Sequence, residues 1–220
     1  MSFEDKLVPI KGDASFRKFY RNKNNNSIIV HSLKHNKQNL LIYDAINKIL
    51  INNKIHAPKL KSEKYKLNYI EIEDLGNITV FKKLKNNTKL KFKYYKKIIK
   101  LLVRVQKIKN KKIKTFLNTE YYVPTYTKKK ILDEVRLFLD WYIPKKIHKK
   151  KQNLLKKKLN YIFNKLIYKL KNKKLIFVHR DFHVSNLMIF KNKLVIIDTQ
   201  DAVYGNIAYD LASLIDDVRL

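Results

Sequence analysis

The sequence predicts an α+β fold of two lobes, a small N-terminal antiparallel sheet with one helix and a mainly helical C-terminal part. Two observations support this prediction. Strand-like segments fill most of the first third of the chain, and longer segments with apolar residues at helical spacing follow them. Short apolar segments then return on both sides of a polar motif. We therefore expect an N-lobe over residues 1–72, a hinge over 73–77 and a C-lobe over 78–220.

The N-lobe elements follow in chain order. Segments 16–20 and 27–33 can pair as a hairpin across the asparagine-rich run 22–26. Segment 39–53 has its apolar residues at helical spacing. Segment 65–73 alternates as a strand does, and it completes the expected sheet.

The predicted hinge begins with Glu73-Asp-Leu-Gly76. Such a segment can present backbone N–H and C=O groups to adenine, and it can equally be an ordinary acidic turn. Glycine is scarce in this chain: only Gly12, Gly76 and Gly205 are present, where an average chain of this length has about 15. A glycine retained in such a composition indicates a positive φ angle or a close approach to a ligand.

Three helices and three strands are predicted for the C-lobe before a final helix near Tyr209. The expected helices cover 90–108, a segment that opens at Thr127, and 152–170. The expected strands are 175–178, 187–190 and 194–197.

The motif between these strands carries the strongest functional signal. His179, Arg180, Asp181 and Asn186 fit the catalytic-loop pattern His-Arg-Asp, four residues, Asn, and Asp198 ends an apolar run twelve residues after Asn186. In phosphoryl transfer an aspartate accepts the proton of the attacking hydroxyl, and an amide and a second carboxylate hold Mg²⁺. A polar turn beside a buried histidine would explain any one of these residues, but not the ordered set.

The composition bears on the binding partners and the cellular location of the protein. The formal charge of +32 comes from 44 Lys and 6 Arg. Lysine, asparagine and isoleucine share A/T-rich codons, and no nucleic-acid-binding motif accompanies the charge, so we expect no nucleic-acid partner. There is no cysteine and no apolar run of membrane-spanning length, and because the first residues lack a basic segment followed by an apolar one, we expect no signal peptide there. We expect a cytoplasmic protein without a membrane partner.

Together the motifs GDASFRKFYR, IEDLG, ILDEVRLFLDWY, VHRDFHVSNLM and IIDTQDAVYGNIAYDLASL resemble the aminoglycoside phosphotransferase-like superfamily. Within it they look most like the bacterial anomeric kinases of N-acetylmuramate and N-acetylglucosamine. The resemblance covers nearly the whole chain. It implies a protein-kinase-like bilobal fold, with ATP and Mg²⁺ as cofactors.

The resemblance also implies roles for single residues. Asp181 is the expected catalytic base, His179 braces the catalytic loop, and Asn186 and Asp198 hold magnesium. The residues expected at the nucleotide are Gly12 and Ser15 over the phosphates, and Glu73, Asp74 and Leu75 at adenine. Candidates for contact with the acceptor are Glu134, Asp140 and Trp141, the last of which could equally be a core residue.

The chain departs from the superfamily in three places. Lys34 is displaced from the strand position of the usual phosphate-binding lysine, so no lysine is assigned to that role. Thr199 follows the metal-binding aspartate, where phenylalanine is usual. Relatives continue for about half as much again, so we expect a truncated C-lobe in which Leu211, Leu214 and Ile215 are exposed.

The sequence thus predicts an ATP-dependent kinase of a small-molecule hydroxyl, most plausibly the anomeric hydroxyl of an amino sugar. Two alternatives stay open: a kinase of an aminoglycoside, choline or another alcohol, and an inactive truncated pseudokinase or basic nucleic-acid-associated protein. The sequence does not determine the oligomeric state.

Overall fold

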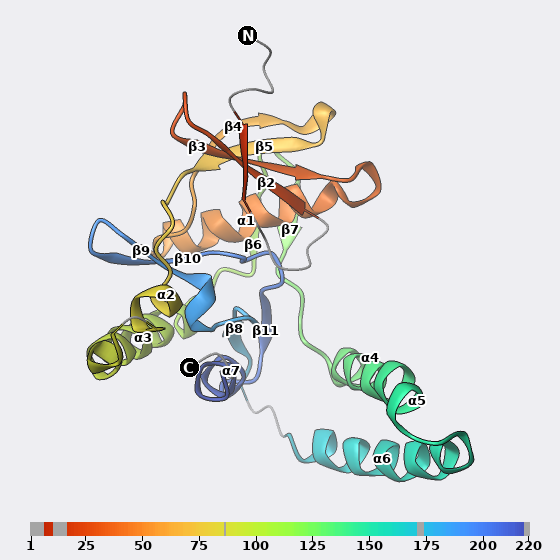
Figure 1. Cartoon of the computed structure of the whole chain (residues 1–220). Helices are drawn as coiled ribbons and strands as arrows, with labels where there is room; N and C mark the ends of the chain where they lie inside the picture. Colours follow the sequence, from red (N-terminus) through yellow and green to blue (C-terminus); the bar gives the residue numbers. More distant parts are fainter. Residues whose placement is uncertain (1–6, 11–16, 86, 171–173, 218–220) are drawn as a thin grey trace.

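The computed structural model describes residues 7–10, 17–85, 87–170 and 174–217, and it has the predicted α+β architecture (Figure 1). Five antiparallel strands form a sheet in the order β1-β2-β3-β5-β4, and helix α1 packs against it. The elements of this part are β1 (Leu7–Ile10), β2 (Arg17–Asn22), β3 (Ser27–Ser32), α1 (Gln38–Asn52), β4 (Leu60–Lys64) and β5 (Tyr69–Glu73).

Alternation along the strands explains why the sheet packs on α1. Ile28 and Val30 of β3 and Ile70 of β5 point to one face, where they meet Leu40 and Tyr43 of the helix. The predicted hairpin is confirmed, with Arg17 opposite Ser32 and Asn22 opposite Ser27.

The prediction of one strand over 65–73 is wrong in its first half. Tyr65–Leu67 forms a 3₁₀ turn, and Asn68 follows it in the left-handed region with φ 62°. Asparagine tolerates this conformation better than most residues. The chain therefore reverses there and adds the unpredicted strand β4 to the sheet edge.

The rest of the described chain is mainly helical, with short two-stranded pairs. Its elements are α2 (Val80–Lys85), α3 (Lys91–Gln106), β6 (Lys112–Lys114), β7 (Glu120–Tyr122), α4 (Lys128–Leu137), the π-helical turn Phe138–Tyr142, α5 (Ile143–Lys146), α6 (Lys149–Lys169), β8 (Ile176–Val178), β9 (Leu187–Phe190), β10 (Lys193–Ile196), β11 (Val203–Gly205) and α7 (Tyr209–Ile215).

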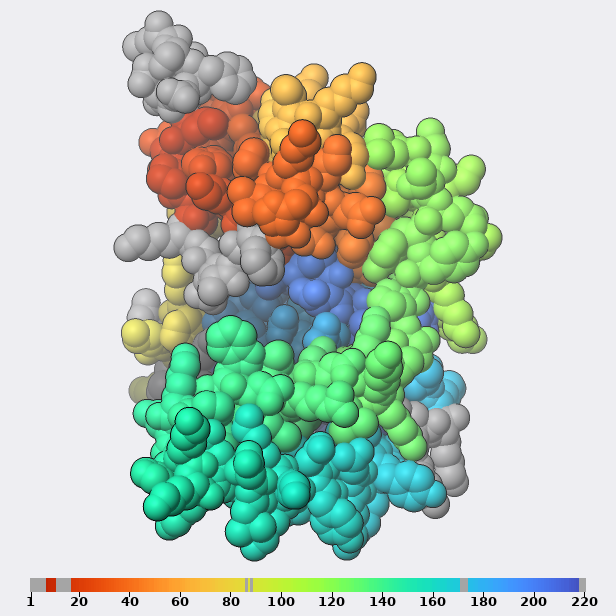
Figure 2. Space-filling model, turned by 90° about the vertical axis from the view of Figure 1, so that its right-hand side faces the viewer, coloured from red at the N-terminus to blue at the C-terminus, as the bar shows by residue number. Residues whose placement is uncertain are grey.

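The largest apolar core lies where the two parts meet. Ile46 and Ile49 of α1 join Ile98 and Leu102 of α3, and Ile196 of β10 belongs to the same cluster. This shared core fixes the β9–β10 hairpin below the sheet (Figure 1). Helices α4 to α6 lie further out, and a recess separates them from the sheet, with residues of the C-terminal part at its floor (Figure 2).

The apolar stripe of α7 is only partly covered within the described residues. The expected exposure of all three residues is wrong for Leu214, which is fully buried because it packs in the largest apolar core. Leu211 is 38% exposed and Ile215 73%. Among the described residues, no helix is both long and apolar enough to cross a bilayer.

Candidate active site

A buried aspartate holds the backbone of the His-Arg-Asp loop. Asp210, at the start of α7, accepts hydrogen bonds from the backbone N–H groups of His179 at 2.7 Å and Arg180 at 2.9 Å. Its side chain is buried, and burial raises its pKa above the ordinary value, although His179 and the two N–H groups act against this shift. We did not predict this role from the sequence, where the only signal is a carboxylate placed inside an apolar helix.

Removing the Asp210 carboxylate is expected to destabilise the protein strongly. Asp210→Ala leaves two backbone donors without their acceptor, and each such loss costs about 1–3 kcal/mol. The free energy of unfolding measured in urea should fall by roughly 2–5 kcal/mol. Asp210→Asn keeps one acceptor oxygen and should lose less. Asp216→Ala removes an exposed acid at the end of the same helix and serves as control. Equal stability of Asp210→Ala and the control would contradict the bracing role.

Arg180 links the loop to helix α4. Its backbone has φ 79°, an uncommon conformation for a side chain of this size. Its Nη2 donates to Glu134 Oε1 at 2.6 Å, and its guanidinium lies 5.0 Å from the centre of the Tyr126 ring. The hydroxyl of Tyr126 donates to the other Glu134 oxygen. Glu134 thus holds the His-Arg-Asp loop through Arg180, a contact that our sequence prediction missed.

His179 joins the loop to the neighbouring hairpin. Its side chain is buried, with Nε2 3.0 Å from the carbonyl oxygen of Ile197. Because Ile197 directly precedes Asp198, this contact ties the position of the loop to the position of that carboxylate. The bracing role expected for His179 stays a prediction.

Asn186 and Asp198 lie together at the open end of the β9–β10 hairpin. Leu187 pairs with Ile196, and the backbone N–H of Ile197 donates to the carbonyl of Asn186 at 3.0 Å. The side-chain amide of Asn186 donates to the backbone oxygen of Asp181 at 3.1 Å. These hydrogen bonds therefore connect the His-Arg-Asp loop to the open end of the β9–β10 hairpin.

Two contacts hold the turn that carries Asp198, one from strand β2 and one from helix α1. Asp198 has φ 60°, and its Oδ1 lies 2.6 Å from Nη2 of Arg17, which comes from β2 of the sheet. The following Thr199 is buried, and its hydroxyl donates to Asn47 Oδ1 of α1 at 2.6 Å. A threonine here makes a hydrogen bond that phenylalanine could not make. The Arg17 contact was not predicted, although Arg17 lies in the GDASFRKFYR motif.

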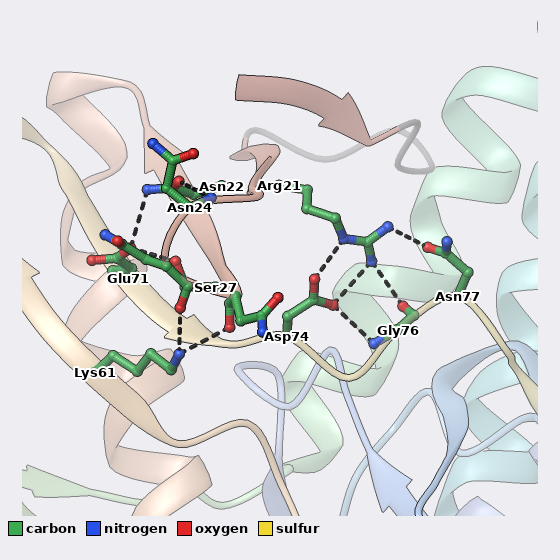
Figure 3. A network of polar contacts seen from close by, with 11 residues as sticks. Arg21, Asn22, Asn24, Ser27, Lys61, Glu71, Asp74, Gly76 and Asn77 are labelled. Atoms are coloured by element: carbon green, nitrogen blue, oxygen red, sulfur yellow. Dashed lines mark hydrogen bonds and ion pairs between the residues drawn. The ribbon is translucent and has the colours of Figure 1, made fainter. Parts of the chain in front are cut away.

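The segment after β5 is clamped by a second arginine of β2 (Figure 3). Arg21 binds both carboxylate oxygens of Asp74, at 2.6 and 3.0 Å, and also donates to the carbonyl of Gly76 and to Asn77 Oδ1. Gly76 has φ 76°, which glycine adopts without strain. The carboxylate of Asp74 is thus occupied by Arg21, and only the backbone of Asp74 is available to a nucleotide.

The other two predicted adenine contacts occupy different environments. Glu73 ends β5, where its backbone N–H donates to Lys59 and its carboxylate lies 3.4 Å from His56 Nε2. Leu75 is buried in a cluster with Met188 and Val195 of the hairpin. The predicted hinge therefore contacts the element that carries Asp198.

The remaining predicted site residues are not brought together with the loop. Asp140 pairs with Lys156 at 3.4 Å, and Trp141 is 67% exposed, both in the π-helical turn. Among the described residues, no hydrogen bond or ion pair joins either to the catalytic loop. Trp141 is not a core residue of the described chain. Gly12 and Ser15 lie outside the described residues.

An antiparallel sheet with one helix, set above a braced His-Arg-Asp loop and a carboxylate-bearing hairpin, defines a protein-kinase-like fold. An aminoglycoside phosphotransferase of Streptomyces rimosus shares it, with a TM-score of 0.67 at 10% identity over 94% of this chain and 76% of that one.

The chain belongs to the phosphotransferase enzyme family, whose model matches residues 6–219. The N-acetylmuramate/N-acetylglucosamine kinase of Neisseria meningitidis serogroup B is 27% identical over 93% of this chain and 59% of its own length. The enzyme of that name from Pseudomonas aeruginosa is 23% identical over 96% and 60%. The chain thus spans about 60% of the length of these relatives.

Proposed function

We propose that this phosphotransferase moves the γ-phosphoryl group of ATP to the anomeric hydroxyl of N-acetylmuramate or N-acetylglucosamine. The observation that supports it most is the pair of hydrogen bonds that join Asp181 to Asn186, and Asn186 to Ile197, the residue before Asp198. The sugar enters the proposal from the names of the relatives, which match this chain over more than nine tenths of its length.

Asp181 would act on the acceptor. It is exposed, and the loop around it is fixed through its neighbours His179 and Arg180 and through its own backbone oxygen. A carboxylate held in this way can accept the proton of a sugar hydroxyl as that oxygen attacks phosphorus. Positioning the hydroxyl accounts for much of the rate enhancement in reactions of this class.

The donor set at the hairpin end fits Mg²⁺, which prefers oxygen ligands and usually binds one or two carboxylates together with substrate phosphates. Asp198 offers a carboxylate that is 38% exposed. Asn186 uses its amide nitrogen on Asp181, so its amide oxygen is the atom that it can offer a cation. Bound there, the ion would neutralise charge on the transferring phosphoryl group.

The remaining predicted contacts complete the proposal. The backbone of Glu73, Asp74 and Leu75 would bind adenine, and Gly12 and Ser15 would cover the phosphates. The acceptor would lie between the loop and helix α4, in the recess of Figure 2. Asp140 and Trp141 are exposed enough to contact a sugar there, and an indole face can stack on a pyranose ring. Glu134 would act by holding Arg180.

A transfer assay with a blocked acceptor tests this function. We expect label from γ-³²P-ATP to move to N-acetylmuramate or N-acetylglucosamine, and the reducing end of the product to be lost. The methyl glycoside of N-acetylglucosamine, which lacks a free anomeric hydroxyl, should accept nothing. Transfer to the methyl glycoside would place the acceptor oxygen elsewhere on the ring. Transfer only to choline or an aminoglycoside would replace the proposed substrate class, and no transfer to any acceptor would contradict the kinase proposal.

A further inference from the structure

Arg17, the first residue of β2, carries a positive charge from the sheet into the candidate metal site. Its Nη2 lies 2.6 Å from Asp198 Oδ1, across 181 residues of sequence, and the arginine itself is only 7% exposed. Burying a cation carries a desolvation cost. A buried arginine beside a candidate metal ligand is therefore a candidate for function.

Strand β3 of this chain lacks the cation that protein kinases carry there, and Arg17 takes the corresponding position. Protein kinases carry a phosphate-binding lysine on the third strand of this sheet. Here β3 contains neither lysine nor arginine, and Lys34 is exposed beyond its end. Arg17 is paired directly opposite Ser32, and opposite residues of antiparallel strands point to the same face. Because Ser32 is small and buried, the longer side chain of Arg17 can occupy that face of the sheet.

Two aromatic rings hold the guanidinium in place. Its central carbon lies 5.5 Å from the ring centre of Phe19, two residues along the same strand, and 5.2 Å from that of Tyr43 on α1. The faces of such rings attract a cation. Burial raises the pKa of Tyr43 to about 12, against the opposing effect of Arg17, so its hydroxyl stays protonated at neutral pH. The arginine is thus aimed at Asp198 before any ligand binds.

We propose that Arg17 binds the phosphate groups of the nucleotide, in the role that a strand lysine has in other kinases. This inference rests on the proposed function. Arg17 would neutralise Asp198 in the nucleotide-free chain. When Asp198 turns to a metal ion, Arg17 would release it and donate to phosphate oxygens beside it. The planar, multi-donor guanidinium matches phosphate oxygens well.

Calorimetric titrations with Mg·ATP and with adenosine separate this role from a structural one, because adenosine lacks the phosphates. Arg17→Ala should weaken binding of ATP by about 10-fold or more, as expected for a lost charge-assisted hydrogen bond, and leave adenosine binding unchanged. Lys18→Ala is the matched control, since it removes the same charge from the next residue of β2, which is exposed and points to the other face. Its affinities should equal those of the unchanged protein.

Equal affinities of Arg17→Ala and the unchanged protein for ATP would overturn the proposal, and so would an equal loss for ATP and adenosine. If Arg17→Ala does not fold, Arg17→Gln provides the same comparison, because it keeps a polar side chain beside Asp198 and removes the charge. Failure of the unchanged protein to bind ATP would contradict the proposed function itself, which distinguishes that result from a failure of the Arg17 assignment alone.

Discussion

Asp181→Asn is expected to lower the rate of phosphoryl transfer by roughly 10²–10⁴-fold, the range that positioned proton acceptors contribute. Asparagine has the same shape as aspartate but cannot accept the proton of the acceptor hydroxyl. The loop should stay in place, because Asn186 binds the backbone oxygen of residue 181 and Asp210 binds the two preceding N–H groups. Affinity for Mg·ATP should therefore be unchanged.

Single-turnover rates and nucleotide titrations on the same preparation measure these two expectations separately. Asp216→Asn changes an exposed acid at the end of α7 and should behave as the unchanged protein does. If Asp181→Asn retains full turnover, Asp181 is not the catalytic base. If it loses nucleotide binding together with turnover, the residue acts on the nucleotide rather than on the acceptor.

Substitution of Asp198 should damage both binding and turnover. Asp198→Ala removes the proposed metal ligand and leaves the buried Arg17 without this carboxylate. Turnover should fall by about 100-fold or more, the scale of one lost electrostatic contact in an active site. Affinity for Mg·ATP should also fall, whereas affinity for adenosine should stay unchanged because adenosine carries no phosphate.

The backbone conformation of Asp198 makes a second variant necessary, because alanine changes both the charge and the backbone strain. Asp198 has φ 60°, and alanine in the left-handed region costs about 1–2 kcal/mol. Asp198→Asn tolerates that conformation better and removes the charge alone. Both variants should show the same split between ATP and adenosine, and only Asp198→Ala should be measurably less stable for backbone reasons. The exposed Asp201 provides a control in the adjoining turn. Normal ATP affinity in Asp198→Asn would contradict the metal-ligand assignment.

The sequence by itself determined the local elements of this protein. Apolar spacing located α1, α3 and α7, and the helix expected to open at Thr127 is α4, with Thr127 as its N-cap. The β2–β3 hairpin followed from two strand-like segments around an asparagine run. These features depend on residues within a few positions of one another, so a local pattern is enough to predict them. The order of the motifs likewise sufficed to predict the family.

Only the tertiary structure decided which side chains meet across the molecule. Arg17 contacts Asp198, Asp210 binds the backbone of His179, and Glu134 binds Arg180. Each contact joins elements far apart in the chain, and a periodic pattern contains no information about the partner. Glu134 was therefore predicted to contact the acceptor, and Arg17 was given no role. A carboxylate or guanidinium is recognisable in a sequence, but its partner depends on the path of the folded chain, which brings groups from distant segments within hydrogen-bonding distance.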